Sequence, residues 1–452
     1  MPVKTLIPVL FSLLLAIPAS ATKQATPERG IAKVLNIRDR ADLVLRVTRD
    51  RLDRFLAGFM RETGFDMWIV ACNEDNLDPV LMTMMPYENW CPITPIVVLF
   101  DRGPDKGVER INVSRMDTQG LFENAWDAAA WDKDKKESQW DCLCRVVRER
   151  DPKRIGIDTG EIQWAAGGLT SVLEARLEEA VGPLYTARLR SAEPLATLWL
   201  ETLGDEEIGI MGRAAEISRS IIADMFSSSV VTPGRTTTDD LRFYYWQRVA
   251  DLGLDVSFSP FVSIRGRAPA DVERHGKPDK VIRPGDIVHC DVGLKYMRWN
   301  SDHQEVAYVL RAGETDVPET FRKMMAEANR LQDVYRGEFR TGLTGDEILR
   351  NTLRKAAEAG IPGPKVYSHS LGYFLHEPGP LIGLPWEQAN NPGRGDVRLV
   401  PGSCFTAEMS VTAPVPEWGG TEFRLPLEQD VAFTGGEVVF LAGRQTAFHL
   451  IH

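Results

Sequence analysis

Three carboxylates in the C-terminal half of the chain each follow an apolar, strand-like run, and this pattern constrains the fold more than any other feature. They are Asp291 after Ile287-Val-His-Cys, Glu408 after Cys404-Phe-Thr-Ala, and Glu428 after Leu425-Pro-Leu. A charged side chain at the end of a buried strand is costly unless it is paired or bound to a metal ion. The fold must therefore bring these carboxylates to cationic partners.

A fourth carboxylate and a histidine extend this set. Asp302 lies 11 residues after Asp291, across residues 293–301, which we expect to form a hairpin. An antiparallel pair can bring two such side chains together on one face. The histidines also gather in this half, since none of the seven precedes His275 and five fall within residues 275–376. One of them, His369, could join the carboxylates.

Together these residues predict a carboxylate-rich metal site with one imidazole. Such a site suits two hard divalent ions bridged by carboxylates, and manganese or cobalt suits it better than a lone structural zinc ion. Taken alone, each carboxylate is better explained as a helix cap or a loop residue. The metal hypothesis therefore depends on the whole set: Asp291, Asp302, His369, Glu408 and Glu428.

The overall charge excludes several classes of protein. The 452 residues include 53 Lys and Arg against 64 Asp and Glu, which gives a net charge of −11 and a pI near 5.3. An acidic chain without a dense basic block is a poor nucleic-acid binder, because neutralising phosphate dominates that affinity. With 43% hydrophobic and 26% charged residues, the chain is neither a multi-span membrane protein nor disordered. Its length predicts two or three domains.

The first 21 residues predict a signal peptide. Lys4 precedes an apolar run, and Ala19-Ser-Ala21 follows it, as in a cleavable secretory signal. The alternative is an uncleaved membrane anchor, although the run is short and Pro8 and Pro18 interrupt it. We therefore expect an exported protein, periplasmic or secreted, that is soluble and free of the membrane after cleavage.

Six cysteines follow this segment. An exported protein can form disulfides, and Cys72 with Cys91 could pair. Cys142 and Cys144 lie two residues apart in an expected helix and point away from each other, so a bond between them would be strained. Buried, unpaired side chains are the expectation for the remaining four: Cys142, Cys144, Cys290 and Cys404.

Hydrophobic periodicity predicts an α/β (α+β) chain with two main domains. We expect an N-terminal α/β domain over residues 22–195, with helices at 37–62 and 139–150 and strands at 66–71, 93–100 and 154–158. Residues 194–205 are expected to link it to a C-terminal domain over residues 205–452. That domain should contain helices at 206–225, 238–252, 319–338 and 346–359, and strands at 286–291 and 305–310.

Between about residues 205 and 440, these motifs resemble the M24 metallopeptidases of the pita-bread fold, such as aminopeptidase P, prolidase, methionine aminopeptidase and the non-peptidase creatinase. The similar segments are residues 284–293 around Asp291, Asn300-Ser-Asp302, residues 368–377 around His369 and His376, Phe405-Thr-Ala-Glu408, and Pro426-Leu-Glu428. His275, in Glu273-Arg-His-Gly, resembles another active-site histidine of the family. The resemblance implies a creatinase-like N-terminal α/β domain and a C-terminal pita-bread domain.

The resemblance also implies a role for each site residue. Asp291 would chelate one metal ion, His369 and Glu408 the other, and Asp302 and Glu428 would bridge both. Glu408 would also shuttle the proton, while His275 and His376 would stabilise the oxyanion or hold the substrate. Two divalent ions, manganese first with cobalt or zinc as alternatives, would activate a bridging water. The bond cleaved would join an N-terminal residue to proline.

Several positions depart from the family pattern while leaving the metal ligands intact. Glu305 stands where the family often has Arg, and Met409 follows Glu408 where Pro is usual. Pro426 occupies another family Arg position, with Arg424 two residues upstream. The residue before the metal histidine is Ser368 where the family has Gly. We expect these changes to affect substrate specificity.

Three functions remain open at this point. The first is an exported Xaa-Pro aminopeptidase or dipeptidase that acts on proline-containing peptides, with a homodimer as one assembly. The second is a non-peptidase amide hydrolase on the same fold, and the third is a non-catalytic binding homologue. Two further expectations concern side chains near the motifs. His289 is expected to be a packed strand histidine. Three tryptophans are equally well explained as a proline pocket or as core: Trp299, Trp386 and Trp418.

Overall fold

The structure is a computed structural model that describes residues 34–127, 137–161 and 166–452. The expected signal peptide, residues 1–21, lies outside the described residues. Within those ranges, the search for a helix with the length and hydropathy of a membrane span finds none.

The N-terminal part of the chain is built on a six-stranded sheet with the order β4-β3-β2-β1-β5-β6. Its central strand, β1, pairs antiparallel with β2 and parallel with β5. The strands are β1 (Met67–Ala71), β2 (Ile96–Asp101), β3 (Val108–Asn112), β4 (Glu123–Asn124), β5 (Ile155–Ile157) and β6 (Leu189–Ser191). The helices are α1 (Ile37–Arg54), α2 (Leu56–Thr63), α3 (Pro79–Met84), α4 (Gln139–Arg150), α5 (Ser171–Val181), α6 (Pro183–Thr186) and α7 (Glu193–Glu201).

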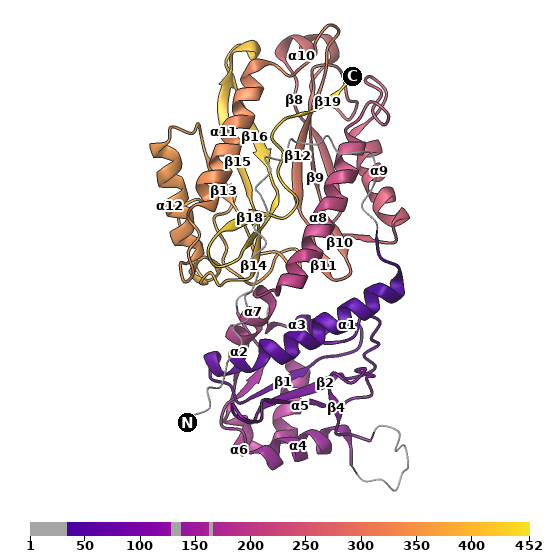
Figure 1. Ribbon diagram of the computed structural model, residues 1–452, viewed down its shortest axis with the longest axis vertical. Coiled ribbons are helices and arrows are strands. Elements are labelled where there is room, and N and C mark those ends of the chain that lie inside the picture. The colour runs from indigo at the N-terminus through magenta and orange to yellow at the C-terminus, as the bar shows by residue number, and fades with distance from the viewer. Residues whose placement is uncertain (1–33, 128–136, 162–165) are drawn as a thin grey trace, which may run out of the picture. The chain divides into compact units, whose positions relative to one another are not determined.

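Helices cover both faces of this sheet. Figure 1 shows α1 and α3 on one side of β1 and β2, with α4 and α5 on the other. Alternate residues of β1, Met67 and Ile69, pack in one core cluster with Val146 of α4 and Leu173 of α5. Because successive side chains of a strand point to opposite faces, the fully buried Trp68 lies toward the α1 and α3 side. A strand covered on both faces is apolar throughout, as β1 is.

The C-terminal part contains the remaining sheets, with the orders β19-β12-β9-β8, β13-β15-β16, β14-β17-β18 and β11-β10-β7. Its helices are α8 (Asp205–Met225), α9 (Thr238–Asp251), α10 (Pro269–His275), α11 (Glu319–Arg336) and α12 (Gly345–Glu358), with short 3-10 helices at Arg394–Asp396 and Pro416–Trp418. Its first strands are β7 (Asp255–Val256), β8 (Phe261–Gly266), β9 (Ile287–Val292), β10 (Leu294–Tyr296), β11 (Trp299–Asn300) and β12 (His303–Val309). The later strands are β13 (Lys365–Tyr367), β14 (Ser403–Thr406), β15 (Glu408–Val415), β16 (Thr421–Leu427), β17 (Asp430–Phe433), β18 (Val438–Phe440) and β19 (His449–Ile451).

In this part the strands lie between two helix pairs, α8 with α9 and α11 with α12 (Figure 1). Helix α8 packs on β10, β11 and β12, whereas α11 packs on β15 and β16. The two groups of strands meet where Gln304 of β12 forms a bridge with Glu428, which follows β16. The predicted metal ligands lie along this line of contact.

Most of the predicted elements are present, with two corrections. The expected helix at 37–62 is two helices, α1 and α2, with Phe55 between them. The expected link at 194–205 is largely helical, because residues 193–201 form α7 with Pro194 in its first turn. The hairpin after Asp291 contains two extra short strands, β10 and β11, before β12 returns antiparallel to β9. The division into two domains stays a prediction.

All six cysteines are free in the structure. Cys72 and Cys91 are both buried, and burial raises the pKa of their thiols to about 12 and about 11. The suggested pairing of Cys72 with Cys91 is therefore not formed. Cys142, Cys290 and Cys404 are buried as expected, whereas Cys144 is half-buried.

Candidate metal centre

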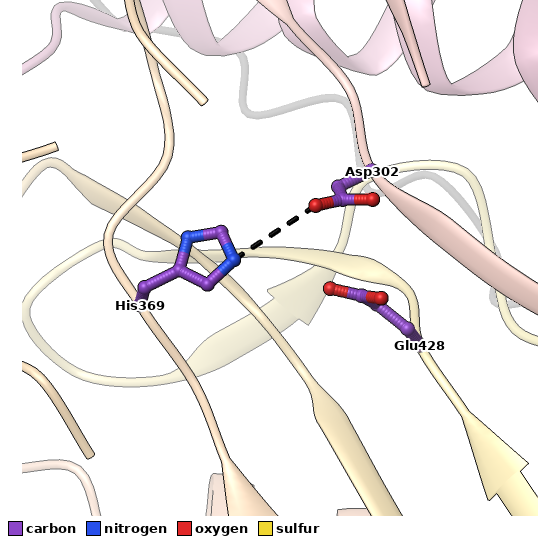
Figure 2. Close-up of side chains that lie close together, drawn as sticks. All are labelled: Asp302, His369 and Glu428. Atoms are coloured by element: carbon purple, nitrogen blue, oxygen red, sulfur yellow. Dashed lines mark ion pairs between the residues drawn. The ribbon is translucent and has the colours of Figure 1, made fainter. Parts of the chain in front are cut away.

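Three of the predicted ligands converge in the interior of the C-terminal part. Asp302, His369 and Glu428 each offer a ligand atom, and these atoms all lie within 4.8 Å of one another. Figure 2 shows the imidazole of His369 pointing at Asp302, with the Glu428 carboxylate beside it. All three side chains are buried. Two carboxylates and an imidazole at this spacing could hold a divalent ion.

The unsatisfied atoms of this triad fit a cation. Oδ1 of Asp302 and Oε1 of Glu428 are buried without a hydrogen-bond partner. Nδ1 of His369 donates to the carbonyl of Ser370 at 3.1 Å, which leaves the Nε2 lone pair facing Asp302. Burial, and then the neighbouring His376, lower the pKa of His369 well below its usual value. The histidine is therefore neutral, as a metal ligand must be.

The other two predicted ligands, Asp291 and Glu408, line a cavity of about 230 Å³ that opens beside the triad. Asp291 lies in β9 and Glu408 begins β15, so the two come from opposite groups of strands. Both carboxylates are only half-buried. They stand where a ligand in the cavity can reach them.

The four carboxylates are close enough to repel one another. Burial, and then the charges of Asp302, Glu408 and Asp291, raise the pKa of Glu428 well above its usual range. Burial, followed by Asp291 as the largest neighbouring charge, does the same for Asp302. Such a group of acids is stable only if protons or metal ions neutralise it. The sequence-predicted set of five therefore comes together in space.

A side-chain amide ties this group of acids to the cavity wall. Gln304 donates from Nε2 to Glu428 Oε2 at 2.7 Å and also hydrogen-bonds Glu408. Because its amide nitrogen faces carboxylates, its oxygen faces His289, whose Nε2 donates to it at 2.8 Å. Burial lowers the pKa of His289 to about 4, so this histidine is neutral. His289 is thus a packed strand histidine, as expected, and it also lines the cavity.

A further acid, Asp430, contacts the backbone of the triad at Asp302. It accepts hydrogen bonds from the backbone N–H of Asp302 at 3.1 and 3.3 Å. Nε2 of the buried His303 lies 3.9 Å from the same carboxylate. Asp430 therefore fixes the backbone from which the Asp302 side chain projects, and His303 is a neighbour of the site.

The side chain of Glu305, which stands where the family often has Arg, points away from the cavity. Gln304 faces the acids, so the next side chain of β12 faces the other side of the sheet. There Glu305 pairs with Arg219 of α8 at 2.7 Å and with His449 of β19 at 2.5 Å. Burial alone would raise its pKa, but His449 and Arg219 outweigh burial and lower it to about 2. Glu305 is therefore a satisfied structural charge.

The two predicted substrate-side histidines differ in their surroundings. The His376 ring lies 4.3 Å from the His369 ring, centroid to centroid, and its side chain is exposed. His275 is the last residue of α10, is also exposed, and is absent from the described residues that line the cavity. The structure thus places His376 beside the metal centre and leaves the role of His275 a prediction.

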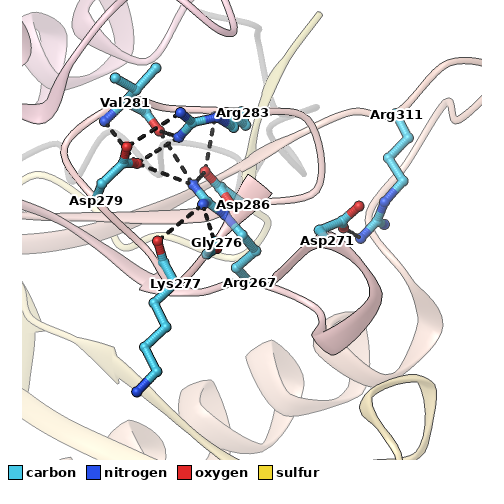
Figure 3. Close-up of polar contacts among 9 residues, drawn as sticks. All are labelled: Arg267, Asp271, Gly276, Lys277, Asp279, Val281, Arg283, Asp286 and Arg311. Carbon is cyan, nitrogen blue, oxygen red and sulfur yellow. Dashed lines mark hydrogen bonds and ion pairs between the residues drawn. The ribbon is translucent and has the colours of Figure 1, made fainter. Parts of the chain in front are cut away.

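The backbone that follows His275 is held by a buried arginine. Arg267 binds Asp286 through two hydrogen bonds of 2.7 and 2.8 Å and donates to the carbonyls of Gly276, Lys277 and Val281 (Figure 3). These contacts fix the loop that leads from α10 into β9. Its position, and hence that of His275, depends on this ion pair.

The loop that carries His369 and His376 is also held from the N-terminal part. Tyr373 donates to Glu207 at 2.6 Å, and the other oxygen of Glu207 binds the buried Arg51 of α1 at 2.8 Å. Arg51 also donates to the carbonyl of Thr202 at 2.6 Å. A buried carboxylate in α8 therefore connects α1 to the loop of both histidines.

The tryptophans do not form a proline pocket around the acids. Trp299 is buried against Tyr373, Trp418 packs on Phe321 and Phe423, and Trp386 is 81% exposed. None of the three is among the described residues that line the cavity. Its apolar wall comes from smaller groups, including Phe261, Pro385 and Pro426.

Comparison with known proteins identifies the family. The model of metallopeptidase family M24 matches residues 209–434, which is half of the chain. This chain belongs to metallopeptidase family M24. The match spans the sequence that carries all five predicted ligands and both groups of strands that meet at them.

Curated relatives of this M24 metallopeptidase match over a shorter stretch. "Probable dipeptidase PepE" from Mycobacterium tuberculosis (strain ATCC 25618 / H37Rv) is 29% identical over 198 residues, which cover 42% of this chain and 46% of the relative. The same protein from Mycobacterium bovis matches equally. The chain thus spans about half the length of the curated relatives it matches.

Solved structures share the fold over nearly the whole chain. An X-Pro aminopeptidase from Thermotoga maritima MSB8 has a TM-score of 0.62 at 18% identity and covers 87% of this chain and 99% of its own. A Xaa-Pro dipeptidase from Bacillus anthracis has a TM-score of 0.56 at 19% identity, covering 91% and 99%. The N-terminal domain of the FACT complex subunit SPT16 from chickpea has a TM-score of 0.55 at 13% identity, covering 90% and 99%. The expected α/β chain of the pita-bread type is thereby confirmed.

Sequence reasoning missed two residues of this M24 site, Gln304 and Asp430. Each lies two positions after a predicted ligand, Gln304 after Asp302 and Asp430 after Glu428. Alternation along a strand would have placed each on the same face as that ligand. A search for polar residues at this spacing would have found both.

Proposed function

We propose that this chain is an exported metal-dependent peptidase that hydrolyses the bond between an N-terminal residue and proline. The observation that carries this proposal is the cluster of Asp302, His369 and Glu428 in an M24 metallopeptidase, with Asp291 and Glu408 on the wall of the neighbouring cavity. Relatives named for dipeptidase and for X-Pro aminopeptidase activity support the substrate class. Export is supported by the signal pattern of residues 1–21.

The residues of the site divide into ligands and substrate contacts. The divalent ions would be held by five side chains: Asp291, Asp302, His369, Glu408 and Glu428. Such ions, manganese being our first choice, polarise a carbonyl and lower the pKa of bound water. Because Glu408 faces the cavity, its carboxylate would take the proton of the attacking water and deliver it to the leaving nitrogen of proline.

The neighbouring side chains would position the peptide. His376, beside His369, would donate to the carbonyl oxygen as negative charge develops on it. Phe261, Pro385 and Pro426 offer apolar surface on which a pyrrolidine ring can pack. His275 is a further candidate for holding the substrate. Its position depends on the loop that follows it, which Arg267 fixes.

Two other functions compete with this proposal. The chickpea SPT16 domain has the same fold under a name that is not a peptidase's, which favours considering a binding homologue. A non-peptidase amide hydrolase on this fold is the other alternative. The intact set of five ligands favours the metallopeptidase over both.

The direct test is hydrolysis of Xaa-Pro dipeptides and Xaa-Pro-Yaa tripeptides by residues 22–452 loaded with Mn²⁺. We expect release of the first residue by the wild type and none by Asp302→Ala. The lengths cleaved decide between dipeptidase and aminopeptidase. A wild type that binds two metal ions yet cleaves neither peptide would refute the Xaa-Pro assignment, and binding of no metal would favour the non-catalytic homologue.

A further inference from the structure

Two arginines stand on the wall of the metal-site cavity without a carboxylate partner. Arg265 of β8 and Arg424 of β16 both line the cavity that Asp291 and Glu408 line. Among the described residues, neither makes an ion pair. Arg424 donates from Nε to Ser410 at 2.7 Å, whereas no hydrogen bond of Arg265 to a described residue is found. The two are close enough for the charge of Arg424 to lower the pKa of Arg265, after the larger effect of burial.

Strand alternation directs Arg265 to the cavity side of β8. Along β8, Phe261 lies opposite Asp291 and Ser263 opposite His289, so this face of β8 looks toward the acids. The register then shifts between Ile264 and Gly266, with Arg265 as the extra residue. Arg265 thus continues the face of Phe261 and Ser263 at a bulge, an irregularity that is common beside active sites.

Arg424 reaches the same cavity from the other group of strands. Along β16, Arg424 and Pro426 point to one face, which is also the face of Glu428 two residues later. Arg424 and Glu408 line the same cavity, which places the guanidinium near that predicted ligand. The cavity thus has an acidic wall and a basic wall.

The buried Arg267, which directly follows β8, has the carboxylate partner that these two arginines lack. Arg267 is bound bidentately by Asp286 and is fully enclosed. A guanidinium prefers such a planar, two-point contact with a carboxylate. Arg265 and Arg424 have the same chemistry, an open cavity in front of them and no internal carboxylate to occupy them.

We propose that Arg265 and Arg424 form a subsite that binds a carboxylate of the substrate next to the metal centre. This inference rests on the proposed peptidase function and narrows its substrate class. The carboxylate has two sources, the C-terminus of a short peptide or an acidic side chain. The cavity, at about 230 Å³, is below the roughly 300–1,000 Å³ of sites for drug-sized ligands, which favours the C-terminus of a dipeptide.

Matched substrates test this inference. Ala-Pro carries a free C-terminal carboxylate, Ala-Pro-amide lacks it, and Glu-Pro-amide moves a carboxylate to the first side chain. For the wild type we expect kcat/KM on Ala-Pro to exceed that on the amide by about 10- to 100-fold, as for a charge-assisted hydrogen-bond pair, mostly through KM. In Arg265→Gln and in the double variant with Arg424→Gln, this ratio should fall toward 1.

The controls separate the subsite from other effects. Arg265→Lys should keep part of the preference, and Arg354→Gln, an exposed arginine on α12, should keep all of it. Metal content and the thermal midpoint of each variant report on folding. A preference for Ala-Pro over Ala-Pro-amide that is unchanged in the double variant would overturn the proposal. A preference for Glu-Pro-amide over Ala-Pro-amide that is lost in the double variant would support the subsite, with the acidic side chain as the source of the carboxylate.

A binding measurement keeps the inference testable if no peptide is cleaved. Calorimetry of L-proline against prolinamide on the metal-loaded chain reports the carboxylate alone. We expect proline to bind about 10-fold or more tightly than prolinamide to the wild type and equally to the double variant. Equal binding of both ligands to the wild type would overturn the C-terminus as the carboxylate that the subsite binds, without bearing on the peptidase assignment.

Discussion

Nε2 of His369 lies 3.8 Å from Oδ2 of Asp302, with both side chains buried and no hydrogen bond between them. This separation is too long for a hydrogen bond. It suits two ligands of one cation, because each would keep its own lone pair directed at a shared point. Glu428 completes the same triangle with an unpartnered oxygen. These three side chains therefore surround a point at which a bound cation would supply the positive charge.

Gln304 should act as a positioning residue for the metal ligands. Replacing it by leucine removes the donor to Glu428 and Glu408 while keeping a similar volume. Loss of a hydrogen bond to a ligand typically lowers metal affinity or activity by about 10- to 100-fold. Metal affinity measured by calorimetry should fall in Gln304→Leu and stay unchanged in Gln247→Leu, an exposed site on α9. Wild-type affinity in Gln304→Leu would show that the amide is dispensable.

His376 should affect rate without affecting metal content. Its ring lies beside His369 but is exposed to the substrate side. In His376→Ala we expect kcat to fall by about 100-fold, the size seen when one oxyanion donor is removed, with normal metal stoichiometry. His452→Ala, at the exposed C-terminus, is the control. Loss of metal from His376→Ala would mean that this residue is a ligand.

The buried charge of Glu305 should stabilise the fold at neutral pH. Its pKa is lowered to about 2 from an unfolded value near 4.5, so its stabilisation is present above pH 4.5 and is lost as the pH falls through about 2. Glu305→Gln should destabilise the protein at pH 7 by about 3 kcal/mol, as for breaking a buried pair. Urea unfolding at pH 7 and pH 3 measures this. A difference from wild type that does not shrink at pH 3 would contradict the account.

A pair of buried acids in the N-terminal part should have the opposite effect on the pH dependence of stability, because they should stabilise the fold at low pH. Burial raises the pKa of Asp78 to about 6, and burial with the charge of Asp78 raises that of Asp158 well above its usual range. Each has one oxygen without a partner, and a proton on Asp158 shared with Asp78 satisfies both. The stabilisation is therefore full below about pH 4 and is lost as the pH rises through about 6 and beyond.

This pair can be tested with Asp158→Asn, which supplies a neutral donor in place of the proton. Each unit of pKa shift corresponds to about 1.4 kcal/mol, so the variant should gain on the order of 2–3 kcal/mol over wild type at pH 8. At pH 4 the two should be alike. Urea unfolding at both pH values provides the measurement, with Asp105→Asn as an exposed control. Equal stability of wild type and Asp158→Asn at pH 8 would show that the acids are not protonated in the fold.

The cluster of Asp302, His369 and Glu428 was predicted from sequence motifs, and the assignment of five metal ligands stays a prediction. Asp291, Glu408 and Glu428 each follow an apolar run in the sequence, which is a local pattern. Helices with side-chain caps were also predicted well, such as α12, where Thr344 and Glu347 form a capping box. Helix α7 was expected to be a link because its N-cap, Ala192, makes no side-chain hydrogen bond that marks a start.

The residues that were missed depend on contacts distant in the sequence. Gln304 binds Glu428 across 124 positions, and Arg51 binds Glu207 across 156. The place of Arg265 beside the acids depends on the pairing of β8 with β9, which no local pattern marks. The choice between a proline pocket and core for the tryptophans also needed such contacts, since Trp418 packs against Phe321 of α11.

The measurement that tests the central claim most directly is the number of Mn²⁺ ions bound per chain, determined by calorimetric titration of metal-free protein. The account predicts two ions for the wild type, loss of both in Asp302→Ala, and a rise in the thermal midpoint on metal addition for the wild type alone. Asp50→Asn, an exposed acid on α1, should behave as the wild type does. A wild type that binds no Mn²⁺, or an Asp302→Ala variant that still binds two ions, would contradict the metal centre on which the proposed function rests.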